Sequence, residues 1–123
     1  MNHFLLVFIG GGLGSVSRYA VSLMMKSFGN GTFPIATLTA NAASSFILGL
    51  VLGQLSGKQD PASGYMMLFL AVGFCGGFST FSTFSFETLE LLKSGNTGAA
   101  VLNIFTNLAV CLLLTVAGIQ LSK

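Results

Sequence analysis

Four long apolar stretches, separated by short polar turns, occupy almost the whole of this 123-residue chain. They cover about residues 4–25, 33–55, 65–92 and 99–121, as judged from hydropathy and from the turn residues between them. A membrane-spanning helix needs about 20 mostly apolar residues. The sequence therefore predicts an all-α integral membrane protein with four transmembrane helices, in one domain that covers residues 1–123.

The composition supports a membrane location and excludes several classes of function. Only 7% of the residues are charged, whereas soluble domains have about 25%, and the mean hydropathy is +0.86. The lipid bilayer is therefore the expected environment. The formal net charge is +2 and the basic residues form no run, so we expect no nucleic-acid partner.

The cysteines and the histidine indicate neither a disulfide framework nor a structural metal site. Cys75 and Cys111 both lie within apolar stretches, and His3 stands alone near the start of the chain. Zinc and haem sites need clusters of such residues at set spacings. We expect both thiols to pack as small apolar side chains.

The third apolar stretch is longer than one span requires, and its middle is unfavourable for a continuous helix. Residues 73–86 contain the pair Gly76 and Gly77, followed by phenylalanines that alternate with serine and threonine. Non-helical backbone at membrane depth is tolerated only where protein or a wet cavity covers it. We therefore expect the third helix to break in the middle, near Gly76 and Gly77, where a bound cation or a neighbouring subunit would satisfy the exposed carbonyl groups.

The lysines favour neither orientation of the four spans. Lys58 and Lys123 fall on one side of the membrane, and Lys26 and Lys93 fall on the other. Orientation follows an excess of lysine and arginine on the cytoplasmic side, and Arg18 changes the balance by only one charge. This near-equality predicts dual topology, in which the chain inserts both ways.

Glycines four residues apart favour close helix packing. Such pairs are Gly10 and Gly14, Gly49 and Gly53, and Gly73 and Gly77. Because four helices are too few to enclose a wide pore, we also expect an oligomer. An antiparallel homodimer would suit the dual topology.

Asparagines inside the second and fourth stretches are candidate functional groups, because polar groups inside a membrane are costly. Asn41 has two interpretations, an interhelical hydrogen bond or an amide donor that lines a pore. Asn103 and Asn107 share one helix face with Cys111 and Thr115. This stripe is either a polar track for an ion or a set of interhelical hydrogen bonds.

Phe81 and Phe84 share a helix face within a segment rich in hydroxyl groups, which is ill suited to a dry surface against lipid. An aromatic ring has a positive edge. Rings presented edge-on therefore attract an anion without the full charge that would trap it. The alternative is that this pair packs in the core, as most aromatic stripes do.

Charged residues near the span ends complete the set of candidates. Arg18 either snorkels to the membrane interface or lines a vestibule. Glu87 is expected to cap or pair locally, and Glu90 is expected to reach solvent.

Three motifs stand out when the candidates are viewed together. They are Gly11-Gly12-Leu13-Gly14 followed by Arg18-Tyr19, the run from Thr37 to Asn41 leading to the run from Ser45 to Gly49, and the run from Gly73 to Ser85. These motifs lie in three of the four stretches, and the third is highly specific. Together they resemble the CrcB or Fluc family of fluoride channels.

The resemblance implies a passive, fluoride-selective channel that exports fluoride through two pores in an antiparallel, dual-topology homodimer. It implies that Phe81 and Phe84 are the pore phenylalanines, with Asn41 as a donor facing them. Ser82 and Thr83 would contribute hydroxyl groups to the same path.

The resemblance also implies a structural sodium ion at the centre of the dimer, held by the backbone carbonyls of Gly76 and Ser79. The expected location is the inner membrane of a bacterial-type cell, with multiple passes. Asn103, Asn107 and Cys111 stand where the family has a track of tyrosine and serine, so Asn107 joins the predicted pore residues. Smaller departures are Ala36 and Ser44 in place of glycine, and Ser79 in place of threonine.

Three other functions match some of these features. A small dual-topology multidrug transporter would need a carboxylate deep in a span, and the first stretch has none. An enzyme would need a base beside a serine or a pair of catalytic carboxylates, so no enzymatic activity is expected. A non-transporting assembly subunit would account for the glycine pairs but not for the polar stripes.

Overall fold

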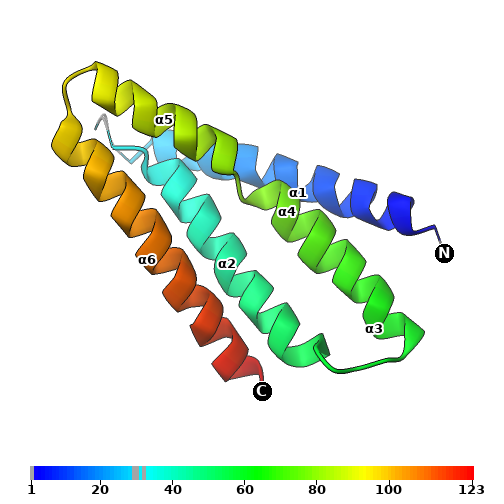
Figure 1. Ribbon diagram of the computed structural model, residues 1–123. Coiled ribbons are helices and arrows are strands. Elements are labelled where there is room, and N and C mark those ends of the chain that lie inside the picture. Colours follow the sequence, from blue (N-terminus) through cyan, green and yellow to red (C-terminus); the bar gives the residue numbers. More distant parts are fainter. Residues whose placement is uncertain (1, 29–30, 32) are drawn as a thin grey trace.

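The computed structural model of the protein describes residues 2–28, 31 and 33–123. All regular structure in these residues is helical, and the helices form a bundle (Figure 1). In chain order they are α1 (His3–Lys26), α2 (Ile35–Leu55), α3 (Pro61–Met66), the π-helix η1 (Met67–Cys75), α4 (Gly76–Phe78), α5 (Phe81–Lys93) and α6 (Thr97–Ser122).

Four helical segments of the described chain are long and apolar enough to cross a membrane. They are α1, α2, the consecutive helices from Pro61 to Lys93, and α6. The prediction of an all-α protein with four such segments is confirmed. The largest difference in boundaries is at the third segment, which begins at Pro61 instead of about residue 65, because Asp60 caps the helix there and Pro61 suits its first turn.

Consecutive segments run in opposite directions. Both ends of the described chain and the α2–α3 connection lie toward one end of the bundle (Figure 1). The C-terminal end of α1 and the α5–α6 turn lie toward the opposite end. Lys58 and Lys123 are therefore at one end, and Lys26 and Lys93 are at the other, as the lysine count assumed.

Two close helix pairs build the bundle, α2 against α6 and α1 against η1 and α4. A Cβ atom added at Gly49 would collide with the Thr115 carbonyl oxygen on α6, and one added at Gly14 would collide with the Phe74 carbonyl oxygen on η1. At each of the six glycines of the predicted pairs, an added Cβ would lie 3.0 Å or less from an atom of a neighbouring helix. The predicted close packing is confirmed, but it lies within the chain and so carries no information about an oligomer.

The third segment departs from an α-helix at two places. Met67–Cys75 is a π-helix, a form that usually occurs only as a single turn and often near functional sites. Ser79 and Thr80 then have extended backbone, with ψ values of 159° and 121°, and they separate α4 from α5.

The interruption therefore lies at Ser79 and Thr80, just after the pair Gly76 and Gly77 near which the sequence analysis expected it. Both glycines are α-helical. The lack of a side chain at Gly77 is explained by helix packing, since an added Cβ there would collide with the backbone of Gly11 on α1. Thr80 ends the interruption because its hydroxyl accepts a hydrogen bond from the Thr83 N–H, at 3.2 Å, and so caps α5.

Apolar side chains cover the outside of the bundle, and several polar side chains are buried inside it. Phe4 and Phe8 are 88% and 78% exposed, whereas Asn103 is only 1% exposed. Soluble proteins show the opposite distribution. The bundle is therefore suited to surroundings of lipid or protein, and its functional polar groups must be sought in its interior.

Candidate functional site

A cavity of about 280 Å³ lies beside the interruption between α4 and α5. Its walls come from α2, the interruption, α5 and α6. The lining residues are Asn41, Ser45, Ser79, Thr80, Phe81, Phe84, Asn107, Leu108, Cys111 and Leu112. The fold thus brings together four of the predicted pore residues, Asn41, Phe81, Phe84 and Asn107.

The two predicted pore phenylalanines have very different surroundings. Their ring centroids are 5.5 Å apart and the ring planes are tilted by 51°. Phe84 is 9% exposed and points into the bundle, whereas Phe81 is 76% exposed. Both rings line the cavity, the Phe84 ring from the interior of the bundle and the Phe81 ring from the surface of the chain.

The Asn41 side chain pairs with both backbone groups of Thr80. Asn41 Oδ1 accepts a hydrogen bond from the Thr80 N–H at 2.7 Å, and Asn41 Nδ2 donates to the Thr80 carbonyl at 3.3 Å. Asn41 Nδ2 also donates to Asn107 Oδ1 at 3.1 Å. Of the two interpretations that the sequence left open, the described residues therefore contain the interhelical hydrogen bond.

The polar stripe on α6 is also engaged in hydrogen bonds. Asn107 Nδ2 donates to the carbonyl and to Oδ1 of Asn103, each at 2.9 Å. Asn103 Nδ2 donates to Thr88 Oγ1 on α5, also at 2.9 Å. Further along the stripe, Cys111 lines the cavity and Thr115 bonds only within its own helix among the described residues, to the Cys111 carbonyl.

Ser82 and Thr83 do not line the cavity. They lie on the first turn of α5, where the Ser82 and Thr80 hydroxyls are 3.3 Å apart. Ser82 is exposed and Thr83 is half-buried. Their hydroxyl groups would meet an ion only outside this cavity.

The two predicted sodium ligands border a hollow of about 160 Å³ that Ser44, Ser45 and Cys75 also line. In a continuous helix the Gly76 carbonyl would accept from the Thr80 N–H, and the Ser79 carbonyl from the Thr83 N–H. Here the Thr80 N–H donates to Asn41 Oδ1 instead, and the Thr83 N–H donates to Thr80 Oγ1. Both carbonyls have therefore lost their helical donors, which fits the main-chain oxygen ligands that a hard cation prefers.

Arg18 joins α1 to the same region. Its Nε donates to the Gly77 carbonyl at 3.4 Å, from a partly buried position. Gly77 is the last residue but one of α4, so this contact reaches the backbone immediately before the interruption. Snorkelling and vestibule roles both stay predictions, and the contact adds a link between helices that the sequence analysis did not consider.

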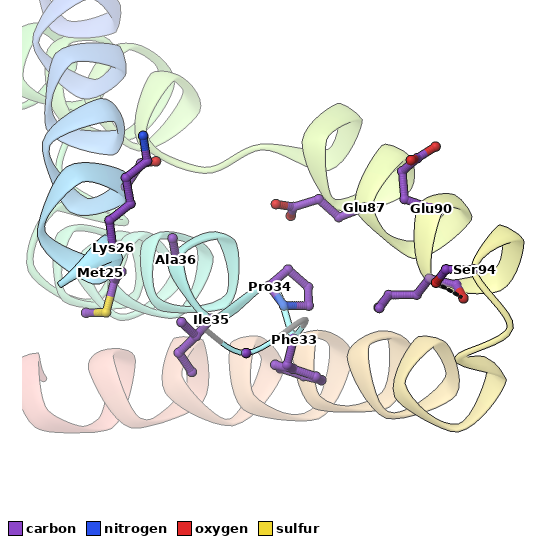
Figure 2. Close-up of a pocket in the computed structure, with 12 residues that line it drawn as sticks. Met25, Lys26, Phe33, Pro34, Ile35, Ala36, Glu87, Glu90 and Ser94 are labelled. Carbon is purple, nitrogen blue, oxygen red and sulfur yellow. Dashed lines mark hydrogen bonds between the residues drawn. The ribbon is translucent and has the colours of Figure 1, made fainter. Parts of the chain in front are cut away.

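A larger cavity, of about 510 Å³, opens between the C-terminal end of α1, the start of α2 and α5 (Figure 2). The charged residues of its lining are Lys26, Glu87 and Glu90. In Figure 2, Glu87 extends into the cavity and Glu90 points away from it. Glu87 Oε1 is buried and has no hydrogen-bond partner in the described part of the chain. At this oxygen Glu87 therefore lacks the expected local partner among the described residues, because its side chain extends into the cavity.

Comparison with families of known sequence shows what the chain is related to. Residues 5–119 match the family described as CrcB-like protein, Camphor Resistance (CrcB). The chain belongs to this family. The resemblance seen in the sequence motifs is confirmed.

Relatives of similar length cover nearly the whole of the chain. A fluoride-specific ion channel FluC of Idiomarina loihiensis is 44% identical over 119 residues, which is 97% of this chain and 91% of the relative. The FluC proteins of Pyrococcus horikoshii and Thermus thermophilus are 44% and 45% identical, and each covers at least 96% of this chain and 94% of its own length. These relatives are named as ion channels, in agreement with the prediction that the chain is not an enzyme.

The sequence analysis missed two residues that hold the site together. Thr80 caps α5, donates its N–H to Asn41 and accepts a bond from Asn41 at its carbonyl, and Thr88 accepts the bond from Asn103. A signal for Thr88 was available, because it follows Phe84 by four residues and therefore shares its helix face. No local signal identifies Thr80, since its partner lies 39 residues earlier in the chain.

Proposed function

We propose that this chain forms a passive, fluoride-selective channel that exports fluoride across the inner membrane of the cell. The observation that carries the proposal is the cavity beside the interruption, where Phe81, Phe84, Asn41 and Asn107 meet. It is supported by relatives that are named fluoride-specific ion channels and are 44% identical over almost the whole chain.

The chemistry of the cavity lining suits a small, strongly hydrated anion. A selective pore must replace the water around the ion without binding the ion too tightly to release it. The positive edges of Phe81 and Phe84 attract an anion weakly, and the lining contains no lysine or arginine to trap it. Asn41 and Asn107 lie along the same path, and the Ser82 and Thr83 hydroxyls follow outside the cavity.

The working unit in this proposal is an antiparallel, dual-topology homodimer with two pores. Phe81 is 76% exposed on a single chain, so a second copy would be needed to enclose an ion beside its ring. The even distribution of lysines between the two ends of the bundle supports insertion in both orientations.

We further propose that the Gly76 and Ser79 carbonyls hold a structural sodium ion where two copies meet. The loss of their helical donors supports this role, because carbonyl groups without partners are costly in a medium of low dielectric constant. When bound, the ion would supply positive potential close to the path of the anion. Arg18 and Glu87 would act near the ends of that path or as structural groups.

The proposal is tested by fluoride efflux from liposomes that contain the purified protein. In Phe81→Ile and Phe84→Ile the side chain stays large and apolar but loses the positive ring edge. An interaction of about 1.4 kcal/mol changes a rate tenfold, and we expect efflux to fall by about that factor or more. Phe105→Ile, at an exposed position of α6, is the matched control and should conduct as the wild type does.

The outcomes also separate the alternative functions. Wild-type efflux of fluoride at the same rate in both isoleucine variants would make these rings packing residues and contradict the proposed pore. Transport of organic cations coupled to protons would instead indicate a multidrug-type transporter. Liposomes that release neither ion would indicate an assembly subunit.

A further inference from the structure

We infer that Asn41, Asn107 and Asn103 form a relay of amide hydrogen bonds that holds α5 at two points and so positions Phe81 and Phe84. This inference rests on the proposed function, because it assigns a role to residues around the proposed pore. It gives the three asparagines a positioning role, carried by bonds between protein groups. The steps below follow the relay from the interruption to the middle of α5.

The first anchor is Thr80, the residue that precedes α5. Asn41 Oδ1 and Nδ2 bond to the N–H and the carbonyl of Thr80, at 2.7 and 3.3 Å. A side-chain amide carries one acceptor and one donor group in the same arrangement as a peptide. Asn41 can therefore replace both partners that the extended backbone of Thr80 lost when the helix was interrupted.

The relay then crosses to α6. The second Nδ2 bond of Asn41 goes to Asn107 Oδ1 at 3.1 Å, and Asn107 Nδ2 continues to Asn103 at 2.9 Å. Asn107 and Asn103 are only 6% and 1% exposed. A buried amide without a hydrogen-bond partner is costly, and the relay supplies these partners.

The second anchor is Thr88, two turns along α5. Asn103 Nδ2 donates to Thr88 Oγ1 at 2.9 Å, and that hydroxyl donates in turn to the Phe84 carbonyl at 2.8 Å. Thr88 is buried and does not line the cavity. The relay therefore ends on the backbone of one of the two proposed pore residues.

These two anchors enclose the part of α5 that carries the rings. Thr80 and Thr88 are eight residues apart, about 12 Å along an α-helix, and both Phe81 and Phe84 lie between them. A shift or rotation of α5 would have to break a bond at each anchor. Because Asn41 has two N–H donors and the bonds to Thr80 and Asn107 use both, its contribution to conduction is to hold the interruption in place.

A matched pair of threonines provides the test. Thr88 and Thr115 each donate to the carbonyl four residues earlier, at 2.8 and 2.9 Å. Of the two, Thr88 also accepts a bond from another helix. Thr88→Val and Thr115→Val therefore both replace a hydroxyl group by a methyl group. Only Thr88→Val removes a hydrogen bond of the relay.

We expect potassium fluoride efflux from liposomes to fall about fivefold in Thr88→Val, the effect of losing one net hydrogen bond of about 1 kcal/mol. Thr115→Val should match the wild type, and Thr88→Ser, which keeps the hydroxyl, should restore most of the rate. A second readout is the ¹⁹F NMR resonance of 4-fluorophenylalanine incorporated at position 84. It should shift or broaden in Thr88→Val but not in Thr115→Val.

A purely structural role for Thr88 would lower the melting temperature and leave both readouts unchanged in the dimers that remain folded, which would overturn the inference. A change in only one of the two readouts would also overturn it, because a displaced Phe84 ring should alter both the ¹⁹F resonance and the rate of fluoride efflux. If Thr88→Val does not fold, Thr88→Cys keeps the volume and offers only a weak acceptor, and the same comparison applies. Failure of the proposed function is recognised separately, because wild-type liposomes would then release no fluoride.

Discussion

Individual polar side chains in this protein act mainly on the backbone of a neighbouring segment. Asn41 bonds to Thr80, Arg18 bonds to the Gly77 carbonyl, and Ser44 Oγ donates to the Cys75 carbonyl at 2.9 Å. Each reaches the third segment between the last residue of its π-helix and the start of α5. At membrane depth a backbone group without a partner costs several kcal/mol, so these side chains make an irregular segment possible there.

Asp60 allows a test at the same scale, in the connection before α3. The Ser63 hydroxyl and backbone N–H donate to its carboxylate, at 2.8 and 3.0 Å, and hold the pKa of Asp60 below its ordinary value of 3.8. A carboxyl group with a lowered pKa stabilises the fold above its ordinary pKa, and the effect is lost as the pH falls through the folded value.

We expect Asp60→Ala to lower the melting temperature in detergent at neutral pH, because it removes the cap of α3. The difference from the wild type should shrink as the pH is lowered from about 5 to about 3. Thermal melts of the two proteins across this range measure it. A difference that stays constant or grows on acidification would show that the charge of Asp60 does not matter.

At the scale of the helices, contact between backbones sets the geometry. The pair α2 and α6 approaches closely enough that a Cβ added at Gly49 would lie 3.0 Å from the Gly118 Cα, besides meeting the Thr115 carbonyl. Small residues favour such approach in membranes, where packing and not water drives helix association. The position of the asparagines on α6 relative to α2 depends on this contact.

Gly49→Ala should therefore destabilise the protein by about 1–3 kcal/mol, the usual cost of overpacking. Melting in detergent measures the change. Gly98→Ala is the control, because a Cβ added at Gly98 meets nothing within 4 Å, and alanine is the better helix former. Equal melting temperatures for the two variants would mean that α2 and α6 can separate without loss.

For the whole molecule, the lysines are the residues that bear on orientation in the membrane and on the proposed antiparallel dimer. The two ends of the bundle carry two lysines each, so we expect the chain to have little preference for one orientation. An antiparallel dimer requires both orientations in one membrane. Charge added at one end should therefore change both topology and activity.

We expect Ser56→Lys with Gln59→Lys, both at exposed positions near the α2–α3 connection, to force a single orientation and abolish fluoride efflux. Asn96→Lys with Thr97→Lys, at the other end, should force the opposite orientation. Reporters fused to the C-terminus measure the orientation. Co-expression of the two variants should restore efflux, and full activity of either variant alone would exclude an antiparallel dimer.

The sequence by itself determined the number and approximate limits of the four spans, because hydropathy and length are local properties of each stretch. Its motifs also determined the family. The spacing of Phe81 and Phe84 put both on the face of α5 that borders the cavity, since helix periodicity is local as well.

Only the tertiary structure decided where the third segment is interrupted and how the asparagines are used. The extended residues are Ser79 and Thr80, because Asn41 on α2 and the Thr80 hydroxyl take the N–H groups that would continue the helix. The bonds from Asn41 to Asn107 and from Asn103 to Thr88 join residues 66 and 15 positions apart. These residues become partners only because α2, α5 and α6 pack around one another, and local sequence patterns do not predict that packing.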